Sequence, residues 1–229
     1  MNEILQTLHK VNREQIRSRL QDFKDFYSNP VSWFFDDEHM VLRKVDRNDN
    51  ERLFEELCFC LLTANTSAES SMKAIDKTRP YLFDSRLDIL QLKLKEAGYR
   101  YPNKRAEYIF EARENFKQDY EFNIKGVIES YNDIKILRDF LKEYIKGFGY
   151  KESSHFLRNI GFPGLAILDK HILRSLVEYE VIKKIPKYLT KKRYFDIENR
   201  FMKFCKETGI DMDEMDLLLW SIKNGKVMK

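Results

Sequence analysis

The chain has 229 residues, enough for one large domain or for two modest lobes that share a core. Hydrophobic residues make up 43% and charged residues 34%, a globular composition that excludes a disordered chain. The net charge of +4 is only mildly basic. It does not by itself indicate a nucleic-acid partner, because such a binder needs its basic excess on one face.

The three cysteines are too few for a disulfide framework or a four-cysteine iron–sulfur cluster, and they indicate a reducing compartment. Cys58 and Cys60 lie in an apolar run, so we expect buried thiols rather than metal ligands. The N-terminus is charged from Glu3 onward, and no apolar run approaches the length of a membrane span. We therefore expect a soluble, cytoplasmic protein with no membrane partner.

Helical periodicity dominates the chain. A long first helix is expected, and apolar residues at helix-face spacing predict further helices around 53–64, 109–116 and 134–144. No sustained alternation with a period of two predicts a strand. Residues 36–51 are polar and rich in charge, which favours a loop or a lobe boundary. The pattern predicts an all-α fold.

The most informative segment is 141–173, where one amphipathic helix is predicted to end and a second to begin near Tyr150. Gly147 and Gly149, one residue apart, allow a tight reversal that exposes the backbone amides of the second helix. Such amides can hold a DNA phosphate without any side chain. Phe148, between the glycines, is expected to fill the core of the hairpin. An ordinary helix C-cap followed by a connector also explains the glycines.

Lys151 follows the turn at the head of the second helix, and Asp169 comes 18 residues later. The helix of 151–160 and a turn at 161–164 can return the chain so that both side chains face one cleft. Asp169 alone also fits a helix N-cap, and a lone lysine is normally a surface charge. The pair, together with the glycine turn, indicates a reactive site.

The segment IKGFGYKESSHFLRNIG, followed by AILDKHIL, resembles the helix-hairpin-helix glycosylase superfamily, with its glycine turn, lysine nucleophile and downstream aspartate. The more specific resemblance is to the type 2 8-oxoguanine DNA glycosylase/lyase group. Matching pieces also lie at Glu56–Glu69, Gly98–Ile109 and Leu217–Lys229, in family order. The resemblance covers about residue 51 to the last residue.

This resemblance implies two helical lobes with the helix-hairpin-helix motif, about 137–160, at the cleft between them. Residues 51–168 would form the central lobe, and residues 1–50 plus 169–229 the second. The expected partner is double-stranded DNA containing a lesion, bound by a monomer in a prokaryotic, nucleoid-associated setting.

The resemblance also implies that Lys151 attacks C1′ of a flipped-out nucleotide in base excision repair, and that the resulting imine leads to strand cleavage by β-elimination. An amine attacks only when neutral, and a helix N-terminus and desolvation both favour that form. Asp169 would either stabilise oxocarbenium charge or help deprotonate the nucleophile. No cofactor or metal is required, and a monovalent cation at the hairpin carbonyls is left open.

In the type 2 group the resemblance suggests that the terminal carboxylate, here that of Lys229, enters the lesion pocket. An acceptor there would gain a hydrogen bond from N7 of 8-oxoguanine and meet a lone pair in guanine, a difference of about 1–3 kcal/mol. Trp220 offers an indole face for stacking on the lesion. The alternatives are a frayed terminus and a core tryptophan.

Arg100 and Tyr101 lie on a turn before a helix expected near Pro102, where they could fill the gap left by an extruded nucleotide. A surface loop explains them as well. Further residues are candidates for DNA contacts, although a helix C-cap or ordinary exposed bases would look the same: Asn65, Lys104, Arg105 and Lys146. His155 is expected on a helix surface, and His171 as a structural hydrogen-bonding group.

Two other functions fit the same sequence. A non-catalytic helix-hairpin-helix DNA-binding protein would keep the glycine turn but would not need Lys151, Asp169 and the tail together. A glycosylase of the same fold could act on another damaged base, such as an oxidised pyrimidine, or on a mispaired adenine. The lack of a four-cysteine cluster weakens a match to endonuclease III without removing it.

Overall fold

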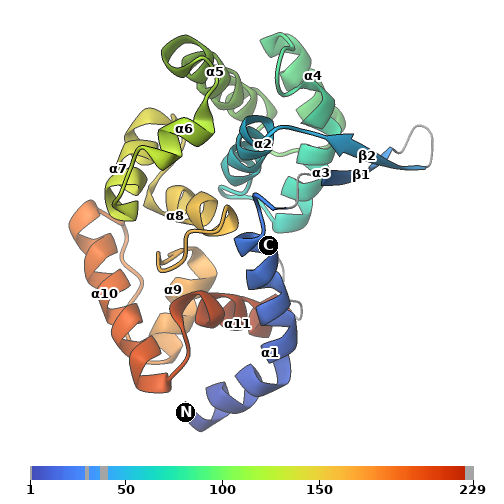
Figure 1. Ribbon diagram of the computed structural model, residues 1–229. Helices are drawn as coiled ribbons and strands as arrows, with labels where there is room; N and C mark the ends of the chain where they lie inside the picture. The colour runs from blue at the N-terminus through green and yellow to red at the C-terminus, as the bar shows by residue number, and fades with distance from the viewer. Residues whose placement is uncertain (1, 29–30, 37–40, 225–229) are drawn as a thin grey trace. The chain divides into compact units, whose positions relative to one another are not determined.

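The computed structural model of the protein describes residues 2–28, 31–36 and 41–224, and these are mostly helical (Figure 1). The all-α class expected from the sequence is confirmed, with one small addition, a pair of strands. The elements in chain order are α1 (Asn2–Lys24), β1 (Val31–Asp36), β2 (Val41–Asp46), α2 (Asp49–Leu62), α3 (Ala68–Thr78), a 3₁₀ turn (Arg79–Tyr81), α4 (Leu87–Glu96), α5 (Pro102–Tyr120), α6 (Ile124–Glu129), α7 (Ile134–Tyr144), α8 (Tyr150–Asn159), α9 (Lys170–Glu178), α10 (Lys191–Thr208) and α11 (Met212–Asn224).

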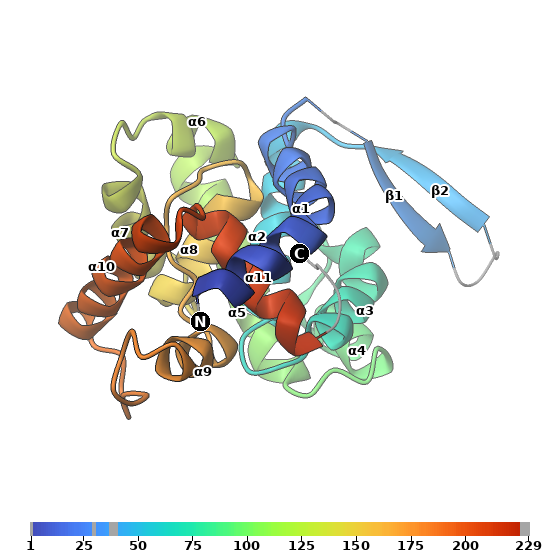
Figure 2. The ribbon, with the colours of Figure 1, turned by 90° about the horizontal axis from the view of Figure 1, so that it is seen from below.

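The strands β1 and β2 form an antiparallel two-stranded ribbon, visible in Figure 2, whose register runs from Val31 opposite Asp46 to Asp36 opposite Val41. The expectation of a loop across 36–51 is therefore wrong for β2 and for the start of α2. Each arm is rich in β-branched or aromatic residues, which favour strands. The arms are short and interrupted by charges, so their alternation is too brief to stand out in the sequence.

The chain forms two compact units, one made of Met1–Phe26 with Leu157–Lys229 and the other of Tyr27–Phe156. The second division falls within α8. These bounds differ from the lobes expected from the sequence, which divide at 50/51 and 168/169. The cleft between lobes expected from the resemblance stays a prediction.

The core of the unit Tyr27–Phe156 is built around α2, which packs against α3, α5 and α6. Leu53, Leu57 and Leu61 are fully buried, and most other residues of α2 are buried too. Asn48 starts α2 with a capping box, since its side chain accepts from Glu51 N–H while the Glu51 carboxylate accepts from Asn48 N–H.

The other unit is held together by α1 against α10 and α11. Leu5, Ile16 and Phe23 lie on one face of α1 and are buried, which gives the first helix the amphipathic stripe that its sequence predicts. A polar contact joins the same helices, since His9 Nε2 lies 2.8 Å from a carboxylate oxygen of Glu214.

All three cysteines are free and buried, which confirms the expectation for Cys58 and Cys60; Cys205 is buried as well. Among the helices described here, none is both long enough and apolar enough to cross a bilayer.

Candidate active site

The predicted hairpin turn is present between α7 and α8. Gly147 has a φ of +94°, a conformation that side chains other than glycine rarely adopt. A Cβ at this position would lie 2.4 Å from the Tyr108 ring and 3.2 Å from the Leu61 side chain. The turn therefore requires glycine both for its backbone conformation and for close packing.

Phe148 fills the inside of the hairpin, as expected, with 7% of its surface exposed and its ring 6.3 Å from that of Phe156. Gly149 begins α8, since its carbonyl accepts from Ser153 N–H at 3.0 Å. The N–H of Gly149 donates to Glu152 Oε2 at 3.1 Å. A DNA phosphate at this amide would thus have to displace a carboxylate.

Lys151 stands at the second position of α8, where the sequence analysis placed it. Its Nζ lies 3.4 Å from Thr63 Oγ1 and 3.8 Å from Glu152 Oε1, and one-fifth of its side chain is exposed. Thr63 ends α2, and its hydroxyl donates to the carbonyl of Cys60, which leaves a lone pair toward the amine. The amine is thus partly desolvated and held in one place, while one edge stays open to solvent.

Glu152 was not identified from the sequence, although a capping pattern was present. A glutamate three residues after the residue that starts a helix commonly accepts from that residue's N–H. In the structure it does so at Gly149, and its other oxygen faces the Lys151 amine. One carboxylate therefore touches both the hairpin amide and the candidate nucleophile.

Asp169 is the N-cap of α9, as its sequence context suggested. Oδ1 accepts from the backbone N–H groups of His171 and Ile172, both at 2.8 Å. Within the described residues of its own unit, Oδ2 accepts no hydrogen bond, so the cap orients the carboxylate while leaving one oxygen available. Asp169 belongs to the unit of Met1–Phe26 with Leu157–Lys229, and Lys151 belongs to the unit Tyr27–Phe156.

The segment leading to Asp169 is held by side chains of α10 and α11 that the sequence analysis missed. Tyr194 Oη donates to the carbonyl of Ala166 at 2.6 Å, and Glu198 Oε1 accepts from Ala166 N–H at 2.9 Å. Asp213 Oδ2 accepts from Gly164 N–H at 2.8 Å. These bonds fix the irregular chain before α9, which positions a reactive group more accurately than a free loop does.

A buried ion pair lies in the same unit, where Arg158 Nη1 donates to Asp216 Oδ2 at 2.5 Å. Burial raises the pKa of Asp216 to about 7; Arg158 opposes this rise, while the charges of Asp169 and Asp213 add to it. Burial also raises the pKa of Asp213. The charge on Asp169 is therefore felt by one carboxyl group of α11, that of Asp216.

The predicted gap-filling residues lie where α5 begins. Arg100 is exposed, its guanidinium carbon is 5.0 Å from the centre of the Tyr101 ring, and Tyr101 is 36% exposed. Asn65, also exposed, follows α2 with a φ of +63°, which asparagine tolerates better than most residues. All three lie on the surface of the unit Tyr27–Phe156.

Two candidate phosphate-contacting lysines are exposed but paired, Lys104 with Glu107 at 3.0 Å and Lys146 with Glu111 at 2.7 Å. The assignment of Arg105 to a phosphate contact is wrong, because its side chain is buried and donates to the carbonyl of Ala64. The surface position expected for His155 is also wrong, since the residue is 7% exposed and its ring lies edge-on to Phe59.

Of the two residues predicted to recognise the base, the structure describes one. Trp220 lies on α11 and is partly exposed, whereas Lys229 lies outside the described residues. Among the residues that the structure describes, no cluster of His, Cys, Asp or Glu could hold a metal ion.

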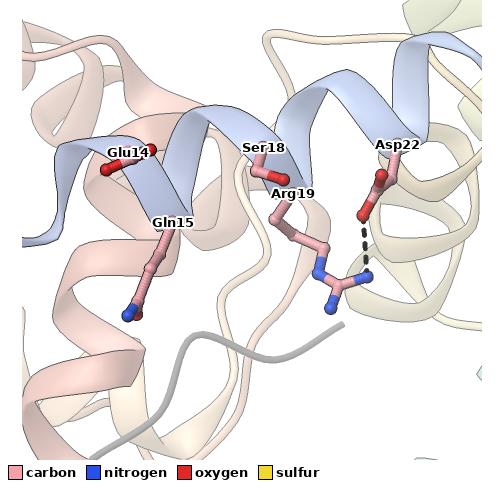
Figure 3. Close-up of a pocket in the computed structure, with 5 residues that line it drawn as sticks. All are labelled: Glu14, Gln15, Ser18, Arg19 and Asp22. Atoms are coloured by element: carbon pink, nitrogen blue, oxygen red, sulfur yellow. Dashed lines mark hydrogen bonds and ion pairs between the residues drawn. The ribbon is translucent and has the colours of Figure 1, made fainter.

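One hollow of about 400 Å³ runs along α1. In Figure 3 its lining side chains project from a single helix, and Arg19 donates to Asp22 at 3.1 Å. The lining residues are Glu14, Gln15, Ser18, Arg19 and Asp22. It contains none of the residues predicted to be functional.

Comparison with known proteins places the chain in a family. Residues 37–210 match the family described as 8-oxoguanine DNA glycosylase. The 8-oxoguanine DNA glycosylase/AP lyase of Korarchaeum cryptofilum is 43% identical over 82% of this chain and 88% of that protein. The protein of the same name from Methanocaldococcus jannaschii is 40% identical over 92% of this chain and 99% of its own length.

Solved structures agree. The M. jannaschii 8-oxoguanine glycosylase/lyase in complex with a 15mer DNA containing 8-oxoguanine superposes with a TM-score of 0.83 at 36% identity, covering 99% of this chain and 100% of that one. The 8-oxoguanine DNA glycosylase of Thermotoga maritima superposes with a TM-score of 0.82 at 35% identity, covering 100% of this chain and 98% of that one.

The glycine turn between α7 and α8, together with the family match, places the chain in the helix-hairpin-helix class of DNA glycosylases. Within that class the chain belongs to the 8-oxoguanine DNA glycosylase family, as the type 2 resemblance of its sequence predicted.

Proposed function

We propose that this protein is a bifunctional DNA glycosylase/AP lyase that excises 8-oxoguanine from double-stranded DNA in base excision repair. The observation that carries the proposal is the Lys151 amine. It lies directly after the Gly147 turn, partly buried, with the Thr63 hydroxyl as a neutral acceptor within 3.4 Å. Relatives that match 92% and 100% of the chain are named for this activity.

In this proposal, Lys151 in its neutral form attacks C1′ of the extruded nucleotide. The bond from C1′ to the base breaks, and the base leaves with a proton. One proton of the attacking nitrogen passes to the departing base and the other to O4′ as the sugar ring opens to an imine, which acidifies the 2′ proton. Removal of that proton expels the 3′ phosphate by β-elimination.

Asp169 supplies a carboxylate whose Oδ1 is held by two backbone N–H groups and whose Oδ2 accepts no hydrogen bond in its own unit. A fixed, unshared oxygen suits the stabilisation of oxocarbenium charge at the sugar. It also suits accepting a proton from the nucleophile, so both roles stay within the proposal.

The proposal extends to base recognition and DNA contacts. The terminal carboxylate of Lys229 would accept from N7 of 8-oxoguanine, with Trp220 stacking on the ring. The amides around Gly147 and Gly149 would hold a phosphate. Arg100 and Tyr101 would fill the gap in the duplex, with Asn65, Lys104 and Lys146 nearby on the DNA. A monovalent cation at the hairpin carbonyls, a monomeric state and a cytoplasmic, nucleoid-associated location remain expectations.

Borohydride trapping tests the proposal, because only a Schiff-base lyase becomes covalently joined to its DNA. The wild-type protein should be trapped on a duplex with 8-oxoguanine, and Lys151→Gln should bind the same duplex without trapping or strand cleavage. Lys135→Gln, which removes an exposed lysine of α7 outside the proposed contacts, should still trap.

The outcomes separate the alternatives. Binding without trapping by the wild type would make the protein a non-catalytic DNA-binding module. Trapping on an oxidised pyrimidine or a mispaired adenine, and not on 8-oxoguanine, would reassign the substrate. Trapping that survives Lys151→Gln would overturn the assigned nucleophile.

A further inference from the structure

The connection between α9 and α10 carries an unusual concentration of positive charge. Its residues 183–193, here called the basic segment, hold six cationic side chains, and all six are exposed. They are Lys183, Lys184, Lys187, Lys191, Lys192 and Arg193. No acidic residue occurs between 181 and 195. The segment is thus a continuous positive surface rather than a mixture of charges.

This segment accounts for the whole basic excess of the protein. The chain has 41 basic and 37 acidic residues, and six of the basic ones lie here, so the rest of the chain has 35 basic residues against 37 acidic ones. A nearly neutral protein with its excess gathered on one element has the charge distribution of a nucleic-acid binder.

Most of these cations are not neutralised by the protein itself. Other lysines pair with nearby carboxylates, for example Lys93 with Glu96 and Lys223 with Glu178. In the part of the chain that the structure describes, five cations of the basic segment form no ion pair: Lys183, Lys184, Lys187, Lys192 and Arg193. A row of unpaired cations repels itself, and a polyanion relieves that repulsion.

The backbone of the segment is held while its side chains project outward. Arg193 Nη1 donates to the carbonyl of Tyr188 at 3.3 Å, and Thr190 caps α10 by accepting from Arg193 N–H. Tyr188 is 65% exposed between Lys187 and Lys191, and its hydroxyl is of the kind that often contacts phosphate. Figure 2 shows the connection between α9 and α10 looping away from these helices.

The segment lies at the end of α9 opposite to Asp169. Asp169 caps the first turn of α9, and the basic segment begins five residues after its last one. A helix of nine residues is about 14 Å long, which corresponds to roughly four base pairs of B-DNA. A duplex whose extruded nucleotide lies at Asp169 therefore has flanking phosphates within reach of the segment.

We propose that the basic segment binds the phosphate backbone of the duplex that flanks the lesion, as a second DNA-contacting surface separate from the hairpin. The inference rests on the proposed function for the placement of the lesion at Asp169. It assigns the segment to affinity for duplex DNA of any sequence and gives it no part in base removal.

The test replaces four unpaired lysines by glutamine, at Lys183, Lys184, Lys187 and Lys192, and measures binding to an undamaged duplex between about 50 and 200 mM salt. The slope of log affinity against log salt should become shallower by about 2 to 4, and affinity near 150 mM salt should fall about tenfold. A version with arginine at the four positions keeps the charge and should bind like the wild type.

A matched control removes the same charge elsewhere, with glutamine at four other exposed lysines, Lys10, Lys95, Lys203 and Lys206. It should leave the salt slope within about one unit of the wild type. A segment variant that binds as the control does would overturn the proposal. Thermal unfolding of both variants shows whether each is folded.

Trapping at saturating 8-oxoguanine DNA separates this inference from the proposed function. The segment variant should still be trapped, because Lys151 is untouched. Failure of the wild type to trap would end the proposed function, while the salt slope on undamaged DNA would still decide whether the segment binds a duplex.

Discussion

Glu152 and Lys151 are neighbours in the chain, and their charged groups lie 3.8 Å apart at the head of α8. The same carboxylate accepts from Gly149 N–H, the amide proposed to hold a DNA phosphate. A phosphate bound at that amide would have to displace the Glu152 carboxylate, whose negative charge opposes its approach.

Glu152→Gln should therefore strengthen binding to an undamaged duplex by roughly threefold to tenfold, because the side chain keeps its bond to Gly149 but no longer repels a phosphate. A binding titration at one fixed salt concentration measures this. Glu129→Gln, which removes an exposed carboxylate at the end of α6, should leave the affinity unchanged. An affinity of Glu152→Gln equal to that of the wild type would show that the charge of Glu152 has no influence on phosphate binding at the hairpin.

Asp216 gives a second residue-scale prediction, on stability against pH. Its folded pKa of about 7 lies above the value of about 3.9 in an unfolded chain. Because the folded pKa is raised, the contribution of Asp216 to the free energy of unfolding is fully present below about pH 4 and is lost as the pH rises through about 7. The free energy of unfolding should therefore fall by up to about 1.4 kcal/mol per pH unit across that window.

Asp216→Asn, which mimics the neutral carboxyl group, should flatten this slope, and urea unfolding at pH 4, 5.5 and 7 would measure it. Asp88→Asn, at an exposed position of α4, serves as the control. An equal slope in Asp216→Asn and the wild type would mean that Asp216 does not carry the pH dependence.

The hairpin between α7 and α8 shows how an element can be identified from the sequence alone. Its glycines, the apolar residue between them and the lysine after them are close together in the chain, so the turn and its location are readable from local pattern. The ring of Tyr108, which makes Gly147 indispensable, comes from α5 and could not be anticipated. Local conformation was predictable, whereas the packing partner was not.

Gly147→Ala should destabilise the protein more than Gly98→Ala, although both glycines have positive φ. Nothing lies within 4 Å of a Cβ at Gly98, so only backbone strain of about 1 kcal/mol is expected there. At Gly147 the overlap with Tyr108 adds about 1–3 kcal/mol. Denaturant unfolding of the two variants compares them directly. Equal losses would mean that Tyr108 moves aside without cost.

The strands β1 and β2 illustrate the opposite case among the elements. Each strand is stabilised by backbone hydrogen bonds to the other, so neither strand would be stable as an extended segment by itself. The local sequence around β2 contains charged residues and turn formers, and this local pattern predicts a loop.

Across the whole molecule, charge is distributed unevenly, with the positive excess in the basic segment and a nearly balanced remainder. The proposed chemistry draws on parts that are far apart in the chain: the hairpin, the cap of α9 and the tail. The tail can be tested without reference to its structure.

Extending the chain past Lys229 by a short peptide should lower the preference for 8-oxoguanine over guanine, because the terminal carboxylate would no longer be available to N7. The ratio of the two excision rates should fall by about tenfold, the effect of losing one buried hydrogen bond. The same peptide placed before Met1 is the control. A preserved ratio would exclude the terminal carboxylate as the group that recognises the lesion.

The sequence by itself determined the helical class, the glycine turn, the family and the two candidate reactive residues, because each depends on spacing over a few residues or on motifs in a fixed order. Only the tertiary structure decided which polar residues are buried and what they hold. Arg105 and His155 look like surface residues in the sequence and are buried, while Tyr194 and Glu198 hold the chain before Asp169 from nearly thirty residues away. The reason is physical: burial and hydrogen bonding are set by segments distant in the chain, and local periodicity carries no information about which of them meet.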